Sequence, residues 1–319
     1  MEKLFQKISL ASATLVLVIL VGIFITLFNA SKPAIDEFGL KFIVDPTWNK
    51  EVPIENLQPK AVEEKPVEEV NEDVVPMDDE IIDEDADGGL TKTIYGGLIP
   101  IVGTFLSTLI ALFFSLPIAM GIAIFLAEIA PKNISKTVGI AIELLAAIPS
   151  IIFGMWGLYY FAPIVANLVG GYQVSLLTAG LVLGVMILPF MAAVTRDSMN
   201  TTPDVLKESA YALGATKFEV IKDIIFPYSK VGIIGSIILA LGRALGETMA
   251  VAFLIGSIFS LPTKLTDPTV SIPVAMANNF GEASGLGESA LFYLALILFI
   301  LSFGAISAAK FFFLRKVQK

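Results

Sequence analysis

The chain contains no cysteine and no histidine among its 319 residues, and only 16% of its residues are charged. Without cysteine and histidine it has no disulfide, no thiolate nucleophile, no histidine-ligated zinc and not the commonest general base. The sequence also lacks a G-x-x-x-x-G-K-S/T phosphate-binding loop, so we do not expect it to hydrolyse ATP itself. These absences argue against a soluble enzyme, and we predict no catalytic residue, no cofactor and no metal site.

Long apolar runs are what the sequence has instead. Hydrophobic residues make up 55% of the chain and its mean hydropathy is +0.81, whereas soluble domains carry about 25% charged residues. A membrane-spanning helix needs about 20 mostly apolar residues. Six runs meet this requirement, at residues 8–28, 95–127, 137–166, 174–194, 231–259 and 289–313. We therefore predict an all-α integral membrane protein with six transmembrane helices.

The first of these runs has two open interpretations, a retained anchor or a cleaved signal peptide. The run is longer than the ~7–15 apolar residues usual in a signal peptide, and no A-x-A cleavage site follows it. We interpret residues 1–28 as an N-terminal anchor helix.

The distribution of positive charge predicts how the chain is oriented in the membrane. Lysine and arginine gather on the cytoplasmic side of membrane proteins, and six spans place both termini on the same side. That side receives most of the cations near span ends: Lys3, Lys7, Lys132, Lys136, Arg196, Lys207, Lys217, Lys222, Lys230, Lys310, Arg315, Lys316 and Lys319. We therefore predict that both termini are cytoplasmic, with residues 314–319 as a tail.

The predicted outer side carries one acidic loop, at residues 29–93. It holds 18 acidic and 6 basic residues, a balance of −12 that leaves +3 for the rest of the chain. Its stretch at about 50–89 has too little apolar surface to bury, so we predict a disordered insertion. Asp83, Asp85, Asp87 and Gly88 match the first half of an EF-hand loop, but Ile94 stands where the bidentate glutamate is needed. A solvated spacer is the favoured interpretation and a calcium site is the alternative.

Two charged residues, Arg243 and Glu247, lie inside the fifth run. A charge at the bilayer centre costs about 2.5–3.5 kcal/mol on insertion scales and has to face protein or water. Arg243 lies roughly 18 Å into the run, near the expected midplane, with Glu247 one turn further on the same face. Two interpretations are open. Either the pair is a salt bridge that fixes helix register, or it is an anion site or gate whose carboxylate favours protonated phosphate over sulfate.

The segment between the fourth and fifth runs, residues 195–230, is predicted to lie in the cytoplasm. Its apolar residues at helical spacing predict a short amphipathic helix that ends at Gly214, followed by a second helical turn at 218–225. Taken alone, this pattern is also typical of a helical loop lying at the membrane interface.

This segment resembles the coupling motif of binding-protein-dependent ABC importer permeases, Glu-Ala-Ala, three residues, Gly, nine residues, Ile-x-Leu-Pro. The positions that match at this spacing are Glu208, Ala210, Gly214, Ile224 and Pro227. Ser209 replaces the second-position alanine and Phe226 replaces the leucine. The resemblance implies that the short helix docks in a groove of a separate ATPase subunit and transmits its movement to the spans.

Residues 142–157 and 240–251 resemble the phosphate-specific transport system and, within it, its C-type permease subunits, as do residues 46–48 and 119–131. The resemblance covers nearly the whole chain from Phe38 on, except the acidic insertion. It implies an ABC importer type I permease fold with a five-helix core at residues 94–313 and ATP-driven uptake of inorganic phosphate across the bacterial plasma (inner) membrane. The implied partners are a second homologous permease subunit, a dimer of cytoplasmic ATPase subunits and an extracytoplasmic phosphate-binding protein, besides the lipid bilayer; no nucleic acid is implied.

In this family an arginine and a glutamate of the fifth span are considered essential for phosphate transport, which by resemblance implicates Arg243 and Glu247. Glu143, in the third run, stays open between helix packing and a role in coupling. Three rival functions remain: a permease for another oxyanion, a secondary transporter, and a membrane receptor that uses the acidic loop. The coupling motif counts against the second, and a charged pair at the midplane is not needed by the third.

Overall fold

The structure, a computed structural model, describes residues 2–53 and 91–314. The acidic insertion and its EF-hand-like stretch fall almost entirely outside these ranges, so their predictions are not tested. The elements are α1 Glu2–Phe38, α2 Lys41–Val44, β1 Lys50–Pro53, β2 Thr91–Ile94, α3 Leu98–Ile124, η1 Phe125–Ile129, α4 Lys132–Ala146, α5 Ser150–Trp156, η2 Gly157–Phe161, α6 Ala162–Val169, α7 Leu176–Asn200, α8 Asp204–Ala212, α9 Lys217–Glu219, η3 Val220–Ile225, α10 Phe226–Leu245, α11 Met249–Ala252, α12 Ile272–Asn279 and α13 Gly285–Leu314. The three η elements are π-helical turns that continue neighbouring α-helices.

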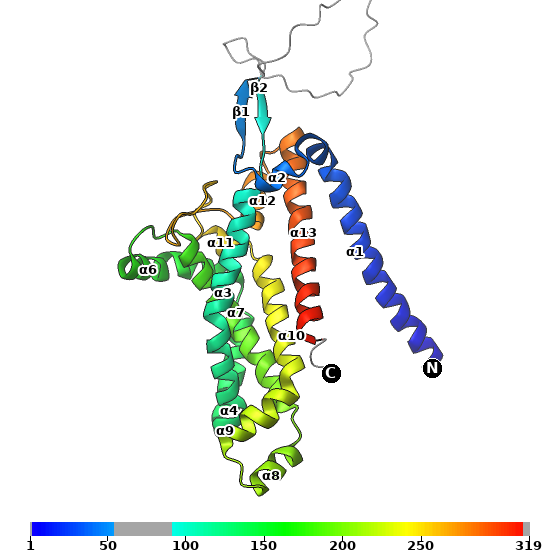
Figure 1. Cartoon of the computed structure of the whole chain (residues 1–319), viewed down its shortest axis with the longest axis vertical. Coiled ribbons are helices and arrows are strands. Elements are labelled where there is room, and N and C mark those ends of the chain that lie inside the picture. The colour runs from blue at the N-terminus through cyan, green and yellow to red at the C-terminus, as the bar shows by residue number, and fades with distance from the viewer. Residues whose placement is uncertain (1, 54–90, 315–319) are drawn as a thin grey trace, which may run out of the picture.

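Six helical segments of the described residues are long and apolar enough to cross a membrane, which confirms the predicted number. They are Leu4–Phe38, Leu98–Ile129, Ser150–Val169, Leu176–Asn200, Lys217–Leu245 and Gly285–Phe311. α3 and α7 lie side by side, α10 packs against α7, and α1 packs against α13 (Figure 1). The start of α1 and the end of α13 point toward one end of the bundle, and β1 and β2 stand at the other end (Figure 1). β1 and β2 pair antiparallel in a two-stranded sheet.

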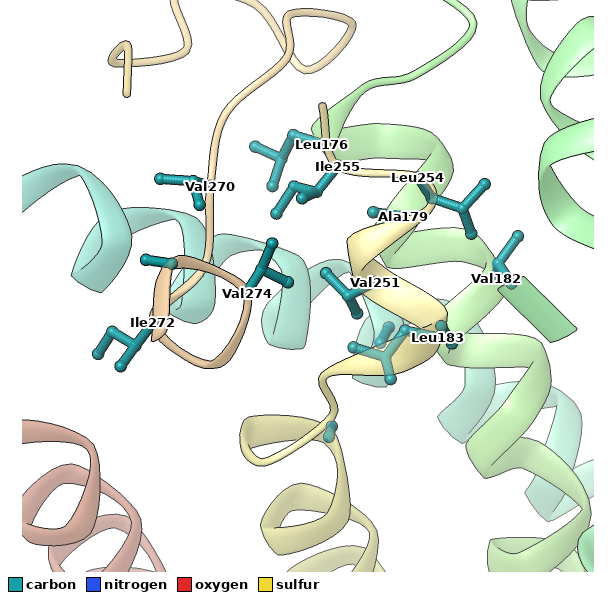
Figure 2. Packing of buried hydrophobic residues seen from close by; sticks show 14 of the residues in the cluster. Leu176, Ala179, Val182, Leu183, Val251, Leu254, Ile255, Val270, Ile272 and Val274 are labelled. Carbon is teal, nitrogen blue, oxygen red and sulfur yellow. The ribbon is translucent and has the colours of Figure 1, made fainter. Parts of the chain in front are cut away.

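The apolar core lies toward the β1–β2 end, where α7 meets a folded segment at residues 249–275. Leu176 and Leu183 of α7 pack with Val251 of α11 and with Leu254, and each of these side chains is at most 2% exposed. Figure 2 shows them near Val270, which precedes α12, and near Ile272 and Val274 of α12. This core fixes the position of the end of α10, which carries Arg243, and of α11, which follows Glu247.

The first helix is longer than predicted. α1 runs to Phe38, so residues 29–38, assigned to the outer loop, continue the helix. Their polar composition hid this extension, which depends on tertiary packing. Ser31 and Ala34 are fully buried, and Glu37 forms an ion pair with Lys92 of β2. Gly39 follows the helix with a positive φ of 53°, and its N–H donates to the carbonyl of Ile35, the pattern of an αL cap.

One helix was predicted for the third apolar run, residues 137–166, but the structure divides this run into separate helices. α4 ends at Ala146, and α5 begins at Ser150 after a break at Pro149. Proline has no N–H to continue the helix and biases the preceding residue toward extended backbone. The apolar crossing segment is therefore Ser150–Val169, whereas α4 packs separately along α7. In Figure 1, α6 extends sideways from the axis of α3 and α7.

The loop between α11 and α12 is held by polar contacts at its own turn. The carboxylate of Asp267 accepts from the Thr263 hydroxyl at 2.7 Å and from the N–H groups of Thr263 and Lys264. These donors, the Thr263 hydroxyl first, lower the pKa of Asp267. The backbone carbonyls of Asp267 and Leu265 accept from the first N–H groups of α7, at Leu176 and Leu177, so the turn also anchors that helix.

One glycine of α3 lies where another part of the chain approaches closely, and it provides a test of this packing. A Cβ at Gly103 would collide with the carbonyl oxygen of Val270, whereas a Cβ at Gly121 in the same helix has nothing within 4 Å. We expect Gly103→Ala to destabilise the protein by about 1–3 kcal/mol. Gly121→Ala should be neutral or stabilising, because alanine is the better helix former by roughly 0.5–1 kcal/mol. Thermal unfolding in detergent measures both, and equal midpoints for the two variants would contradict this packing.

Candidate functional site

The predicted short helix before Gly214 is present as α8. It ends at Ala212, Leu213 is its C-cap residue, and Gly214 follows with a φ of 90°. The Gly214 N–H donates to the Tyr211 carbonyl at 2.9 Å and the Ala215 N–H to the Ala210 carbonyl at 3.1 Å. This pair of bonds defines a Schellman cap, which needs a left-handed residue at that position. The predicted glycine cap is confirmed.

The chain then reverses and starts a second helical unit that leads into α10. Thr216 begins α9 with a capping box, in which its hydroxyl accepts from the Glu219 N–H and the Glu219 carboxylate accepts from the Thr216 N–H at 2.7 Å. η3 and α10 continue from α9, and Pro227 lies in the first turn of α10, directly after the π-helical turn η3. α8 and α10 are thus joined by one tight, capped turn.

A shallow groove of about 330 Å³ lies between α8 and η3. Its lining residues are Ala210, Leu213, Gly214, Ala215, Glu219, Val220, Asp223 and Ile224. Ala210 is buried on its floor, and Leu213 is 90% exposed at its edge. The structure therefore brings Ala210, Gly214 and Ile224 of the coupling motif together. Glu208 and Ser209 are exposed on α8, and Pro227 is exposed on α10 outside the groove.

The two charges of the fifth run lie at a helix end, which corrects the prediction of a continuous helix over 231–259. α10 ends at Leu245 and α11 starts at Met249, so Arg243 is in the last turn of α10 and Glu247 is in the break. Gly246 closes α10. The Glu247 carboxylate accepts from the Ala250 N–H at 3.1 Å, which caps the start of α11.

Arg243 and Glu247 do not pair with each other. No ion pair involves either residue within the two described ranges, so the salt-bridge interpretation does not hold in this conformation. The Arg243 guanidinium instead lies over the ring of Phe190 in α7, with Cζ 5.9 Å from its centroid. Both charged side chains are half-buried. A half-buried guanidinium without a carboxylate partner has donors left for an anion.

Glu143 is tied to α7. Its carboxylate accepts from Nη2 of Arg196 at 2.9 Å, and Arg196 also donates to Asp197 at 2.7 Å. This contact joins α4 to α7 beside a polar pocket of about 460 Å³ lined by Lys132, Lys136, Arg196 and Asn200, among others. The geometry favours the packing role for Glu143.

Two residues of this region were missed in the sequence. Phe190 carries the contact to Arg243, and Glu128, at the end of the second span, forms an ion pair with Lys207 of α8 at 2.6 Å. An aromatic residue within an apolar run gives no signal of its own. Glu128 gives only a weak one, because a carboxylate directly after a transmembrane run can face either water or a protein partner.

Comparison with known proteins places this geometry in a family. Residues 100–316 match the family described as "Binding-protein-dependent transport system inner membrane component". The chain is 41% identical to the phosphate transport system permease protein PstC of Haemophilus influenzae, covering 94% of this chain and 89% of that protein. It is 37% identical to the protein of the same name from Mesorhizobium japonicum, covering 98% and 90%. A chain of the inward-facing MetNI methionine ABC transporter is similar in fold, with a TM-score of 0.52 and 20% identity over 68% of this chain and 92% of that one.

Proposed function

This chain belongs to the family of inner membrane components of binding-protein-dependent transport systems, and on that premise we propose that it is the permease subunit through which an ABC importer passes inorganic phosphate into the cell. The observation that supports phosphate as the substrate is the similarity of almost the whole chain to phosphate transport permeases, at 41% and 37% identity. The six apolar helices and the fold shared with a MetNI chain support a type I permease fold.

The coupling loop supports the proposed partnership with a separate ATPase. The exposed residues of α8 and the groove beside Gly214 offer a docking surface at one end of the bundle (Figure 1). The surface combines exposed apolar side chains, such as Leu213, with the carboxylates of Glu219 and Asp223 at its rim. We assign Glu208, Ser209, Ala210, Gly214, Ile224 and Pro227 to this ATPase coupling.

The break between α10 and α11 is the proposed gate of the phosphate pathway. Arg243 would donate two parallel hydrogen bonds to a phosphate oxyanion, and Glu247 would accept from its protonated oxygen. Sulfate carries no proton at neutral pH, so it would be disfavoured by the carboxylate. Because the Glu247 carboxylate also caps α11, an anion that binds Glu247 would change the connection between α10 and α11.

Three partners complete the proposal: a second homologous permease subunit, a dimer of cytoplasmic ATPase subunits, and an extracytoplasmic phosphate-binding protein. The α8 end of the bundle would face the cytoplasm, together with both chain termini, since lysine and arginine concentrate there. The β1–β2 end would face the binding protein, and the membrane would be the bacterial inner membrane.

Uptake of labelled phosphate tests the proposal directly. Cells without their own high-affinity system would carry this chain with its partner subunits, and excess sulfate or molybdate would be added as competitor. We expect phosphate uptake that neither competitor reduces, and co-purification of an ATPase subunit with the chain. Uptake that molybdate or sulfate abolishes would assign another oxyanion, and a chain that transports phosphate without any ATPase would be a secondary transporter.

A further inference from the structure

The coupling helix α8 touches the rest of the protein through very few side chains. Of its residues Asp204–Ala212, Ala210 is buried and Lys207 is partly buried, and every other residue is exposed. Lys207 and Ala210 are three positions apart, so they lie on the same face of the helix. That face is turned toward the bundle, and the exposed faces are left for a partner.

The two inward side chains make contacts of different kinds. Ala210 joins a small apolar cluster with Ala123 of α3, Met199 of α7 and Val220 of η3. A methyl group buries little area and does not fix an orientation. Lys207 reaches Glu128 of η1, the π-helical turn that continues α3, with Nζ 2.6 Å from Oε1. The contact is also enclosed, because the side chains of Lys207 and Glu128 are only 16% and 9% exposed.

An enclosed ion pair holds its members differently from one at the surface. An exposed pair is worth about 0–1 kcal/mol and is screened by salt, as expected for Lys222 and Asp223, 4.0 Å apart and more than half exposed. Removing one member of an enclosed pair leaves an uncompensated charge away from water, which is strongly unfavourable. The Glu128–Lys207 pair is therefore the strongest single constraint on how α8 sits against α3.

We propose that Lys207 and Glu128 are positioning residues that lock the coupling helix to the transmembrane helix α3, so that displacement of α8 moves α3 as one body. Neither residue belongs to the coupling motif, and neither lies at the Arg243–Phe190 contact. Without the pair, α8 would still present its exposed faces to a partner. It would, however, move relative to α3, so its displacement would not be transmitted to that helix.

The first test needs no assumption about substrate. Because the chain has no cysteine, spin labels can be attached at Asp204→Cys on α8 and Phe113→Cys on α3, both exposed. The distance distribution between them, measured in the assembled complex, should be narrow. It should broaden in Lys207→Gln and in Glu128→Gln, and narrow again in the exchanged pair Lys207→Glu with Glu128→Lys. Lys222→Gln, which breaks the exposed pair, is the matched control and should leave the distribution narrow.

The second test rests on the proposed permease function. In vesicles containing the complex, either single variant should lower the phosphate transported per ATP hydrolysed by about tenfold, the effect of a typical coupling energy between contacting residues, while the ATPase still co-purifies. The exchanged pair should recover the ratio. Single variants with a narrow label distribution and an unchanged ratio would overturn the inference, as would an exchanged pair no better than the single variants. A complex that carries no phosphate would defeat the substrate proposal alone, because the label distances would still report on the pair.

Discussion

Substitution of Gly214 should cause a graded loss of transport in the order Gly, Asn, Ala, Val, with Gly214→Val abolishing phosphate uptake. Gly214 has a φ of 90°, where residues with a Cβ are strained by about 1–2 kcal/mol each. Asparagine tolerates this conformation better than alanine, and a β-branched residue tolerates it least. Loss of the conformation would open the cap that sets the angle between α8 and α9. Uptake by each variant, with co-purification of the ATPase subunit, measures the series.

The order of asparagine and alanine separates two explanations. A Cβ at Gly214 meets nothing within 4 Å in this chain, so the strain lies in the backbone and not in its own packing. If the glycine were needed because an ATPase subunit crowds it, the smaller alanine would be tolerated better than asparagine. An alanine variant that outperforms the asparagine variant would therefore contradict the backbone explanation. Gly121→Ala, also free of contacts within 4 Å but within helix α3, controls for glycine replacement as such.

The number of spans and the short helix capped at Gly214 could be predicted from the sequence because their signals are local. An apolar run of sufficient length reports a crossing helix whatever it packs against. The cap at Gly214 follows from a glycine placed directly after an amphipathic helix. Both are confirmed by the described residues.

The helix ends could not be predicted, because packing and side-chain capping decide them. The fifth run is apolar to residue 259, yet α10 stops at Leu245, since Gly246 ends it and Glu247 caps α11 instead of continuing the turn. A hydropathy profile cannot show that the α10 hydrogen bonds stop at this point and that a side-chain cap replaces them. The same holds for Arg243, whose partner proved to be Phe190 of another helix; no spacing rule relates residues that meet across a bundle.

Replacing Arg243 should reduce phosphate uptake by about 10- to 100-fold in Arg243→Ala, the effect of losing a charge-assisted hydrogen bond or two. Arg243→Lys should keep only part of the activity, because a lysine keeps the charge but lacks the planar fork that binds an oxyanion through two bonds. The chain should still bring down its ATPase subunit, since α8 lies at the end of the bundle and is untouched by the change (Figure 1). Labelled phosphate uptake and co-purification, measured on the same preparations, report the two properties separately.

Variants of the two neighbouring residues show whether Arg243 acts on the anion or only packs. Phe190→Leu removes a contact worth about 0.5–1 kcal/mol at exposed sites, so uptake should fall by no more than several-fold if the guanidinium serves phosphate. Equal losses in Phe190→Leu and Arg243→Ala would mean that Arg243 serves packing and not the anion.

Glu247→Gln keeps an oxygen to accept from the Ala250 N–H and so preserves the cap on α11, while it removes the charge. We expect this variant to lose discrimination between phosphate and sulfate before it loses stability. If phosphate uptake and the preference for phosphate over sulfate are both unchanged, Glu247 only caps α11, and Arg243 is the only one of the two charged residues that acts on the anion.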